Sequence, residues 1–271
     1  MTPMNETYLQ NLEERENFFA RTPFRKLIGS PGKMAKSLLI ERVLQATSRT
    51  HPFTAETFWG DQMTVLLPEA VSVSIHRYGF FESDLSRMVV GYLKPGMVFF
   101  DVGAHFGYYT LLASRLVGPQ GQVHAFEPTP STRSVLKRNA DDKANVSLCA
   151  EAAWDKEGVL QLQDYGTRYL AFNTLGASRL PNNIRRKIDV KEISVSTVTL
   201  DNYAKTSGVV PDLVKIDAEN SELQVLAGMK ALLETRKTAI AVEMGDFNDS
   251  ADASSRKLSI FLRKPAISHT R

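Results

Sequence analysis

The sequence predicts an α/β protein with a doubly wound, mostly parallel sheet, preceded by an N-terminal helical extension and a β-hairpin. Two observations carry this prediction. From residue 97 onward, short apolar segments alternate with helical ones, the order expected of parallel strands joined by helical crossovers. The segment 97–102 is apolar except for Asp101, as expected for a strand buried on both faces. The 271 residues, of which 43% are hydrophobic, suffice for one large core or two small ones.

The charge balance and the apolar pattern exclude several classes of protein. The net charge of +3 comes from 33 basic and 30 acidic residues, too even a balance for the clustered basic face of a nucleic-acid-binding protein. No stretch reaches the roughly 18 apolar residues that a membrane-spanning helix needs. The single Cys149 cannot form an internal disulfide, and the N-terminal residues are too polar for a signal peptide. We therefore expect a cytoplasmic protein with no nucleic-acid or membrane partner.

The N-terminal elements follow from local patterns. Residues 1–56 place apolar residues partly at helical spacing and are predicted to be a helical extension, while residues 57–271 are predicted to form the main domain. Segments 57–59 and 63–67 flank a Gly-Asp pair, which predicts a hairpin with a two-residue turn. Residues 71–76 alternate between apolar and polar, the pattern of a half-buried strand.

The later elements follow from apolar periodicity and from capping residues. Thr129 followed by Pro130, for example, is typical of a helix start. Helices are predicted over residues 84–93, 108–117, 130–141, 221–234 and 254–263. Strands are predicted over residues 97–102, 123–126, 146–149, 159–162, 193–200, 212–216 and 238–244.

The strongest local signal is a glycine loop at the end of the strand over residues 97–102. Asp101 is followed by Gly103 and Gly107, four residues apart, and then by a helix that begins at Tyr108. Glycine lets the backbone turn sharply and approach a ligand, and ligands of open α/β sheets bind at the carboxyl ends of the strands. Asp101 would repel a pyrophosphate, and the third glycine of a dinucleotide loop is missing. The loop therefore favours a ligand with an ammonium group, such as the methionine end of S-adenosylmethionine.

A second acidic anchor, Glu127, ends the next strand, 20 residues after Gly107. An acidic residue at about this separation hydrogen-bonds ribose hydroxyls in related sheets. The alternative is that Asp101 and Glu127 only cap the ends of their strands. Their joint occurrence beside the two glycines favours a nucleoside ligand.

The glycine loop resembles that of class I S-adenosylmethionine-dependent methyltransferases, and a second segment resembles the FkbM family more narrowly. Residues 213–228 contain the run Lys215-Ile216-Asp217-Ala218-Glu219-Asn220-Ser221-Glu222, which is similar to the family's Lys-Ile-Asp-x-Glu-Gly-x-Glu. Residues 79–82, 94–96 and 199–201 also resemble the family, so the similarity covers about residues 57–247.

This resemblance implies a Rossmann-like methyltransferase fold with S-adenosylmethionine as the cofactor. It further implies an O-methyltransferase of a biosynthetic reaction, whose acceptor is the hydroxyl of a small molecule, either a sugar or a natural product. Together with the glycine loop and the second acidic anchor, it identifies these cofactor-binding residues: Glu82, Asp101, Gly103, Ala104, His105, Gly107, Tyr108, Glu127, Pro128, Ala152, Ala153 and Asp217.

The predicted catalytic residues are Asp217, Lys215 and Glu243. Methyl transfer is an in-line displacement that depends mainly on alignment, and a general base contributes when the acceptor is a hydroxyl. Asp217 is predicted to be this base or to orient the acceptor, and Lys215 either tunes the pKa of a carboxylate or forms a structural ion pair. Glu243, on the strand over residues 238–244, would contact the acceptor. No metal is predicted, although Asp217, Glu219 and Glu243 could together hold a divalent cation.

Three features depart from the family pattern. Asn220 stands where the family has glycine, and asparagine tolerates a left-handed backbone. His105 stands at a position often occupied by asparagine. Only 27 residues follow Met244, so the antiparallel strand pair that usually ends the fold is predicted to be shortened. The sheet edge would then be incomplete, or completed by a partner chain in a homodimer.

Two other functions stay open at this point. One is a nicotinamide-dependent oxidoreductase on a related sheet, which Asp101 and the missing third glycine disfavour. The other is a non-catalytic protein that keeps the fold, which the change at Asn220 and the short C-terminus allow. The polar loop over residues 165–190 is either part of the acceptor site or a solvated basic loop.

Overall fold

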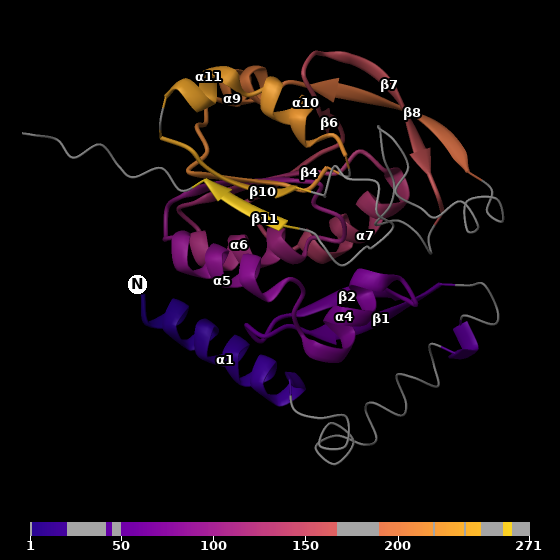
Figure 1. Cartoon of the computed structure of the whole chain (residues 1–271), viewed down its shortest axis with the longest axis vertical. Coiled ribbons are helices and arrows are strands. Elements are labelled where there is room, and N and C mark those ends of the chain that lie inside the picture. The colour runs from indigo at the N-terminus through magenta and orange to yellow at the C-terminus, as the bar shows by residue number, and fades with distance from the viewer. Residues whose placement is uncertain are drawn as a thin grey trace, which may run out of the picture.

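A six-stranded sheet forms the centre of the molecule (Figure 1). The computed structural model describes residues 2–20, 42–44, 50–166, 190–218, 220–235, 237–244 and 257–261. Five neighbouring strands are parallel, and the edge strand β11 pairs antiparallel with β10. In spatial order the strands are β11 (Lys257–Phe261), β10 (Ala239–Met244), β9 (Leu213–Ile216), β3 (Val98–Val102), β4 (Gln122–Phe126) and β5 (Val146–Cys149). The predicted α/β class with a mostly parallel sheet is confirmed.

Helices cover both faces of this sheet, as the doubly wound prediction requires (Figure 1). One face carries α5 (Ser83–Tyr92), α6 (Tyr108–Val117) and α7 (Pro130–Ala140), and the other carries α9 (Leu200–Ser207), α10 (Glu222–Ala227) and α11 (Lys230–Glu234). Successive strand residues point to opposite faces, so Phe99 packs against α5 and α6 while Phe100 packs against α9. Both side chains are fully buried, and the sheet separates two apolar cores.

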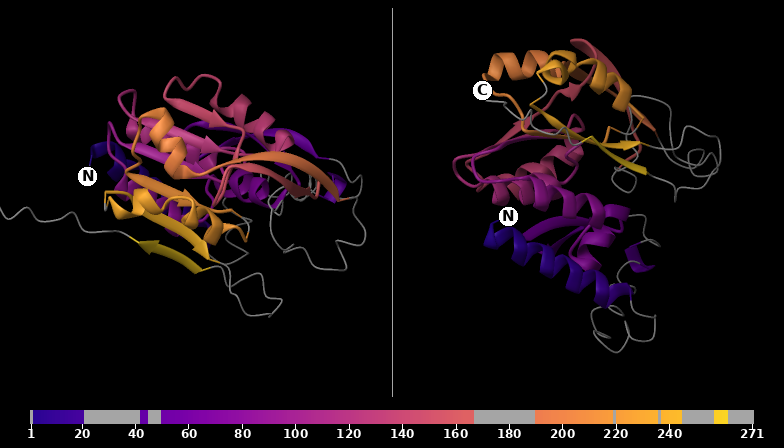
Figure 2. Two further views of the ribbon diagram at one scale, coloured as in Figure 1. Left: turned by 90° about the horizontal axis from the view of Figure 1, so that it is seen from above. Right: turned by 60° about the vertical axis from the view of Figure 1, so that its left-hand side comes forward.

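The N-terminal elements form a further layer beyond α5 and α6 (Figures 1 and 2). This layer contains α1 (Pro3–Ala20), a hairpin of β1 (His51–Glu56) and β2 (Gln62–Leu67), and α4 (Ala70–Tyr78). The hairpin was expected, but its first strand lies before residue 57, and residues 57–61 form the turn. The predicted boundary after residue 56 therefore falls inside the hairpin.

The strand predicted over residues 71–76 is wrong, because these residues belong to the helix α4. The Glu69 carboxylate caps this helix and accepts hydrogen bonds from the backbone N–H groups of Val71 at 2.9 Å and Ser72 at 2.7 Å. Gly79, at φ 77°, ends it in a left-handed conformation. The buried positions Ser72 and Ile75 are three residues apart, so the segment satisfies a helical pattern as well as an alternating one.

Two further predictions in the C-terminal half are wrong. The helix expected over residues 221–234 is broken into α10 and α11 at Gly228, where an added Cβ would lie 1.9 Å from the carbonyl oxygen of Trp154. Within the helix expected over residues 254–263, the described residues 257–261 instead form the strand β11. Because β11 pairs with β10, the outer side of β10 is covered by the chain itself.

A second, three-stranded sheet follows β5 in the chain. It has the order β6-β8-β7, with bounds β6 Ala152–Ala153, β7 Gly158–Asp164 and β8 Lys191–Val198, and it accounts for both alternating segments. The loop between β7 and β8 lies outside the described residues from 167 to 189. In the part of the chain that the structure describes, no helix is long and apolar enough to cross a membrane.

Candidate active site

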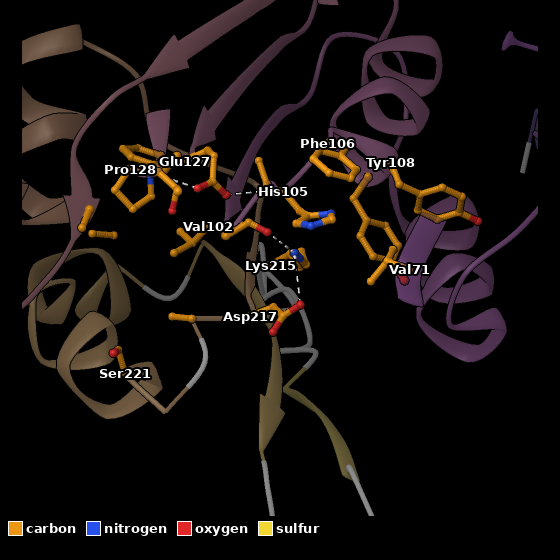
Figure 3. Close-up of a pocket in the computed structure, with 18 of the residues that line it drawn as sticks. Val71, Val102, His105, Phe106, Tyr108, Glu127, Pro128, Lys215, Asp217 and Ser221 are labelled. Carbon is orange, nitrogen blue, oxygen red and sulfur yellow. Dashed lines mark hydrogen bonds and ion pairs between the residues drawn. The ribbon is translucent and has the colours of Figure 1, made fainter. Parts of the chain in front are cut away.

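A cavity opens at the carboxyl ends of β3, β4 and β9 (Figure 3). Its wall combines the glycine loop, the residues that follow β4 and β9, the short strand β6 and part of the N-terminal layer. Parallel strands bring their carboxyl ends to one edge of a sheet, so this is the place where an open α/β fold binds ligands.

The glycine loop is held between the neighbouring strands by its backbone. The N–H groups of Gly103 and Ala104 both donate to the Phe126 carbonyl at 3.1 Å. Gly103 has φ 73°, and a Cβ there would lie 1.8 Å from the carbonyl oxygen of Asp217, so no side chain fits at this position. Gly107, at φ 92°, begins α6 as expected. Of these loop residues, Gly103 and Ala104 line the cavity.

Asp101 occupies a different place from the one expected of a ligand anchor. Its side chain is completely buried and is not part of the cavity wall. The carboxylate accepts a 2.6 Å hydrogen bond from the Thr110 hydroxyl and forms a 3.2 Å ion pair with the Lys215 ammonium. The predicted direct contact between Asp101 and a ligand ammonium is therefore not available, because a protein ammonium already fills that role.

Lys215 joins the two strands that flank the glycine loop. It lies directly opposite Asp101 in the register between β9 and β3. Its Nζ donates to the Gly103 carbonyl at 3.0 Å and lies 3.8 Å from Oδ2 of Asp217. Burial opposes the charged form of Lys215, but the carboxylates of Asp101 and Asp217 outweigh it and raise the pKa of this ammonium. Lys215 is therefore paired with carboxylates, as its position beside Asp217 led us to expect.

Asp217 follows β9 and faces the cavity (Figure 3). Its side chain is 20% exposed, in contrast to that of Asp101. The turn after it contains Asn220 at φ 74°, so asparagine does adopt the left-handed conformation that the family's glycine would provide. Glu219 lies outside the described residues, and so does the side chain of Glu243 on β10.

Glu127 is the carboxylate that reaches the cavity from β4. Its Oε2 accepts the His105 backbone N–H at 3.0 Å, and its Oε1 accepts the Thr129 backbone N–H at 2.9 Å. Burial raises the pKa of the Glu127 carboxyl to about 7, although hydrogen bonds from Thr129 and His105 and the nearby Arg133 oppose the shift. No ion pair with Glu127 is present among the described residues, so its partners are neutral donors.

His105 places an imidazole between the two halves of the cavity (Figure 3). Its backbone has φ 52°, a left-handed conformation in which histidine is found more often than most residues. The ring centroid lies 3.9 Å from that of Phe106, and Nε2 is buried with no hydrogen-bond partner in the described part of the chain. Burial lowers the pKa of His105, so the imidazole is neutral at pH 7.

The other predicted cofactor residues divide into two groups. Pro128, Ala152, Ala153 and Tyr108 line the cavity. Glu82 lies behind it, where its carboxylate accepts a 3.1 Å hydrogen bond from the Tyr109 hydroxyl. Among the described residues, no group of three His, Cys, Asp or Glu side chains is arranged to hold a metal ion.

Eleven residues of the cavity wall were not among the predicted site residues, and four of them come from elements whose role the sequence does not show. Val71 and Ile75 come from α4, whose helical nature the alternating pattern conceals, and Phe81 follows that helix. Ser221 comes from the turn after β9, where the sequence marks only a helix start. The glycine after α4 is a sequence signal that could have identified the end of this helix.

Comparisons with known proteins agree with this geometry. The family model described as the methyltransferase FkbM domain matches residues 101–264. The 31-O-demethyl-FK506 methyltransferase FkbM of Streptomyces tacrolimicus is 32% identical over 178 residues, covering 57% of this chain and 67% of that protein. The hexuronic acid methyltransferase AglP of Haloferax volcanii is 26% identical over 157 residues, covering 57% of this chain and 59% of that protein.

A solved structure of the same family name is also similar. The methyltransferase FkbM from Methylobacillus flagellatus aligns with a TM-score of 0.36 and 13% identity, over 63% of this chain and 41% of that chain. The aligned parts thus span between 41% and 67% of these three proteins. The family match covers more than half of the chain and begins at the glycine loop, which favours methyl transfer over nicotinamide-dependent oxidation. This chain belongs to the FkbM methyltransferase family.

Proposed function

We propose that this protein transfers a methyl group from S-adenosylmethionine to a hydroxyl group of a small molecule. The observation that carries the proposal is the position of Glu127, a buried carboxylate on the cavity wall with only neutral hydrogen-bond partners. A carboxylate of this kind can accept hydrogen bonds from the two hydroxyls of a ribose. The glycine loop beside it allows the backbone to approach the ligand.

The residues around the cavity fit the parts of this cofactor. Small and apolar side chains beyond Glu127, among them Pro128, Ala152 and Ala153, offer surfaces against which an adenine ring can pack. The unpartnered Nε2 of His105 offers a hydrogen bond to the amino-acid part. When bound, the cofactor supplies a methyl group on a positively charged sulfur.

Asp217 is the residue that we assign to the acceptor. An acceptor hydroxyl that took the methyl group, while the carbon–sulfur bond of the donor broke and the thioether left, would have to lose its proton, and a carboxylate at the cavity wall could accept it. Lys215, whose Nζ lies 3.8 Å from Oδ2 of Asp217, forms an ion pair that orients this carboxylate. Alignment of donor and acceptor supplies most of the acceleration, on the order of 7–11 kcal/mol, so Asp217 contributes the smaller share.

The acceptor class rests on the relatives. Their names state that one acts on 31-O-demethyl-FK506 and another on a hexuronic acid, so one acceptor is a natural product and the other a sugar acid. The first name supports an oxygen of a small molecule as the acceptor, and the second supports a sugar acid without naming the methylated group.

Calorimetry with S-adenosylmethionine, S-adenosylhomocysteine and NAD tests the cofactor. We expect both adenosyl ligands to bind and NAD not to bind, and binding of NAD alone would contradict the proposal. Incubation with an isotope-labelled methyl donor and cell extract, followed by mass spectrometry, should then find a labelled small molecule. Asp217→Asn should reduce this labelling about 100-fold and change the affinity for S-adenosylhomocysteine less than threefold. A protein that binds the donor but labels no fraction would be non-catalytic.

A further inference from the structure

Ser221 belongs to the cavity wall, and its hydroxyl makes no hydrogen bond within the described part of the chain. The residue is 2% exposed. A buried hydroxyl without a partner loses its hydrogen bonds to water and gains none in return. Such a group is unusual in a folded protein and calls for an explanation.

Helix capping does not explain this hydroxyl. Ser221 directly precedes α10, a position where serine normally accepts a hydrogen bond from a backbone N–H of the first turn. Here its backbone has φ −114° and ψ 11°, and the side chain makes no capping bond. The neighbouring Glu222 carboxylate instead accepts the Asn220 backbone N–H at 3.1 Å. The hydroxyl is therefore left for something that enters the cavity.

The position of Ser221 indicates which part of a ligand it would meet. In Figure 3 it lies at the lower left, below Glu127 and Pro128, and away from Val71 and Tyr108 at the right. The backbone N–H of Val225 donates to the Ser221 carbonyl, and Val225 packs in the same apolar cluster as Ala153. Ser221 thus belongs to the half of the cavity whose other lining residues are mostly apolar.

Few polar groups in this half are free for a ligand. The Glu127 carboxylate accepts the Thr129 backbone N–H and is the group that our proposed function reserves for the ribose. A purine has apolar faces and polar edges, so it needs flat apolar neighbours and at least one hydrogen-bonding group. Pro128, Ala152 and Ala153 provide the first, and Ser221 provides the second.

We propose that the Ser221 hydroxyl hydrogen-bonds the edge of the adenine ring of the methyl donor and thereby contributes to selection of the base. This inference rests on the proposed function. It assigns Ser221 to donor binding rather than to the acceptor or to the fold. The Ser221 hydroxyl is unsatisfied in the free protein, and the bound ligand supplies its hydrogen-bond partner.

Ser221→Ala tests the assignment, with Ser114→Ala as a matched control. Ser114 is also buried, but its hydroxyl is hydrogen-bonded to Asn145 at 2.7 Å and does not reach the cavity. Calorimetry should use two probes: S-adenosylhomocysteine and 5′-methylthioadenosine, which keeps the adenosine but lacks the amino-acid part. Thermal unfolding of each free variant reports the effect on the fold. Ser221→Cys, close in size to serine, gives a second variant in case the alanine variant does not fold.

We expect Ser221→Ala to weaken both probes by the same factor, roughly three- to tenfold, since one neutral hydrogen bond is lost. The melting temperature of the free variant should stay unchanged or rise, because an unsatisfied buried hydroxyl is removed. Ser114→Ala should instead lower the melting temperature and leave both affinities unchanged.

Three results would overturn the inference. Unchanged affinity for both probes would show that Ser221 contacts no part of the donor. A loss confined to S-adenosylhomocysteine would move the contact to the amino-acid part. A lower melting temperature for Ser221→Ala, as in the control, would show a structural role. A wild-type protein that binds neither probe would contradict the proposed function itself, which is a separate outcome.

Discussion

The carboxylates at the ends of β3 and β4 occupy similar places in the sequence but different places in the molecule. Asp101 pairs in register with Ala125, which lies two residues before Glu127. At about 3.3 Å per residue, Asp101 therefore lies roughly 6–7 Å deeper along the strand direction. Asp101 is completely buried and ion-paired, while Glu127 reaches the cavity wall.

The depth of a carboxylate along its strand decides which partners it needs. A charge inside the fold needs a charged partner, and Lys215 provides it for Asp101. A charge at the rim can be held by neutral backbone N–H groups, as Glu127 is, and keeps its capacity to bind a ligand. Asp101 therefore supports the glycine loop through Lys215, whereas Glu127 lines the cavity.

Removal of the internal counter-ion should have the largest effect. Lys215→Met leaves the Asp101 carboxylate buried without a cation, which should lower the free energy of unfolding by about 3–5 kcal/mol. Urea unfolding at pH 7.5 measures this change. The exposed pair of Lys143 and Asp142 gives the control, and Lys143→Met should lower the stability by less than about 1 kcal/mol.

The partner substitution distinguishes an ion-pair effect from a packing effect. Asp101→Asn in the Lys215→Met background removes the stranded charge and keeps an acceptor for the Thr110 hydroxyl, so the double variant should be more stable than Lys215→Met alone. If the double variant is no more stable than Lys215→Met, the unpaired Asp101 charge does not cause the loss of stability. Lost packing of the lysine stem would then be the cause.

The sequence was sufficient to predict features that depend on local pattern. The apolar segment before Asp101, the glycine spacing and the separation of Glu127 from Gly107 each lie within one stretch of chain. Parallel pairing then brings the strand ends together, and the structure places these predicted residues on the cavity wall: Gly103, Ala104, His105, Tyr108, Glu127, Pro128, Ala152, Ala153, Lys215 and Asp217.

Features that depend on register or on competing patterns could not be predicted in this way. The pairing of Lys215 with Asp101 follows from the alignment of β9 against β3, which neither strand's sequence specifies alone. Whether Asp101 or Glu127 reaches the cavity depends on the alignment of β3 against β4. In α4, an alternating pattern and a helical one fit equally well, and the Glu69 cap decides between them.

Removal of the charge at the rim should act on binding rather than on folding. Glu127→Gln should weaken S-adenosylhomocysteine about tenfold to 100-fold in calorimetry, because hydrogen bonds to a charged group contribute about 1.5–3 kcal/mol. The free energy of unfolding should decrease less in Glu127→Gln than in Lys215→Met, because the loss of the Glu127 charge leaves no buried cation without a partner. Glu192→Gln on the exposed part of β8 should change neither quantity. A Glu127→Gln variant with wild-type affinity would show that the ligand does not depend on the Glu127 charge.

Protonation of Glu127 should have the smallest effect of the three and should be visible without a mutation. Burial raises the pKa of this carboxyl to about 7, so about nine-tenths of it is protonated at pH 6 in the free protein. The affinity for S-adenosylhomocysteine should therefore be constant above about pH 8 and be roughly tenfold lower at pH 6. Burial lowers the pKa of His105, so that imidazole is neutral at pH 7 and above.

A change in pH affects the stability of the free protein in the direction opposite to its effect on ligand affinity. Because the folded-state pKa of Glu127 lies above the unfolded value, the native state binds the extra proton between about pH 4.5 and 7. The contribution of Glu127 to the stability of the free protein is therefore largest at low pH and is lost as the pH rises through 7. Acidification should thus weaken ligand binding, whereas protonation of Glu127 favours the folded protein. Glu127→Gln should abolish the pH dependence of binding. A pH-independent affinity in the wild-type protein would mean that the ligand does not use the Glu127 carboxylate, and the two strand ends would then differ in depth but not in function.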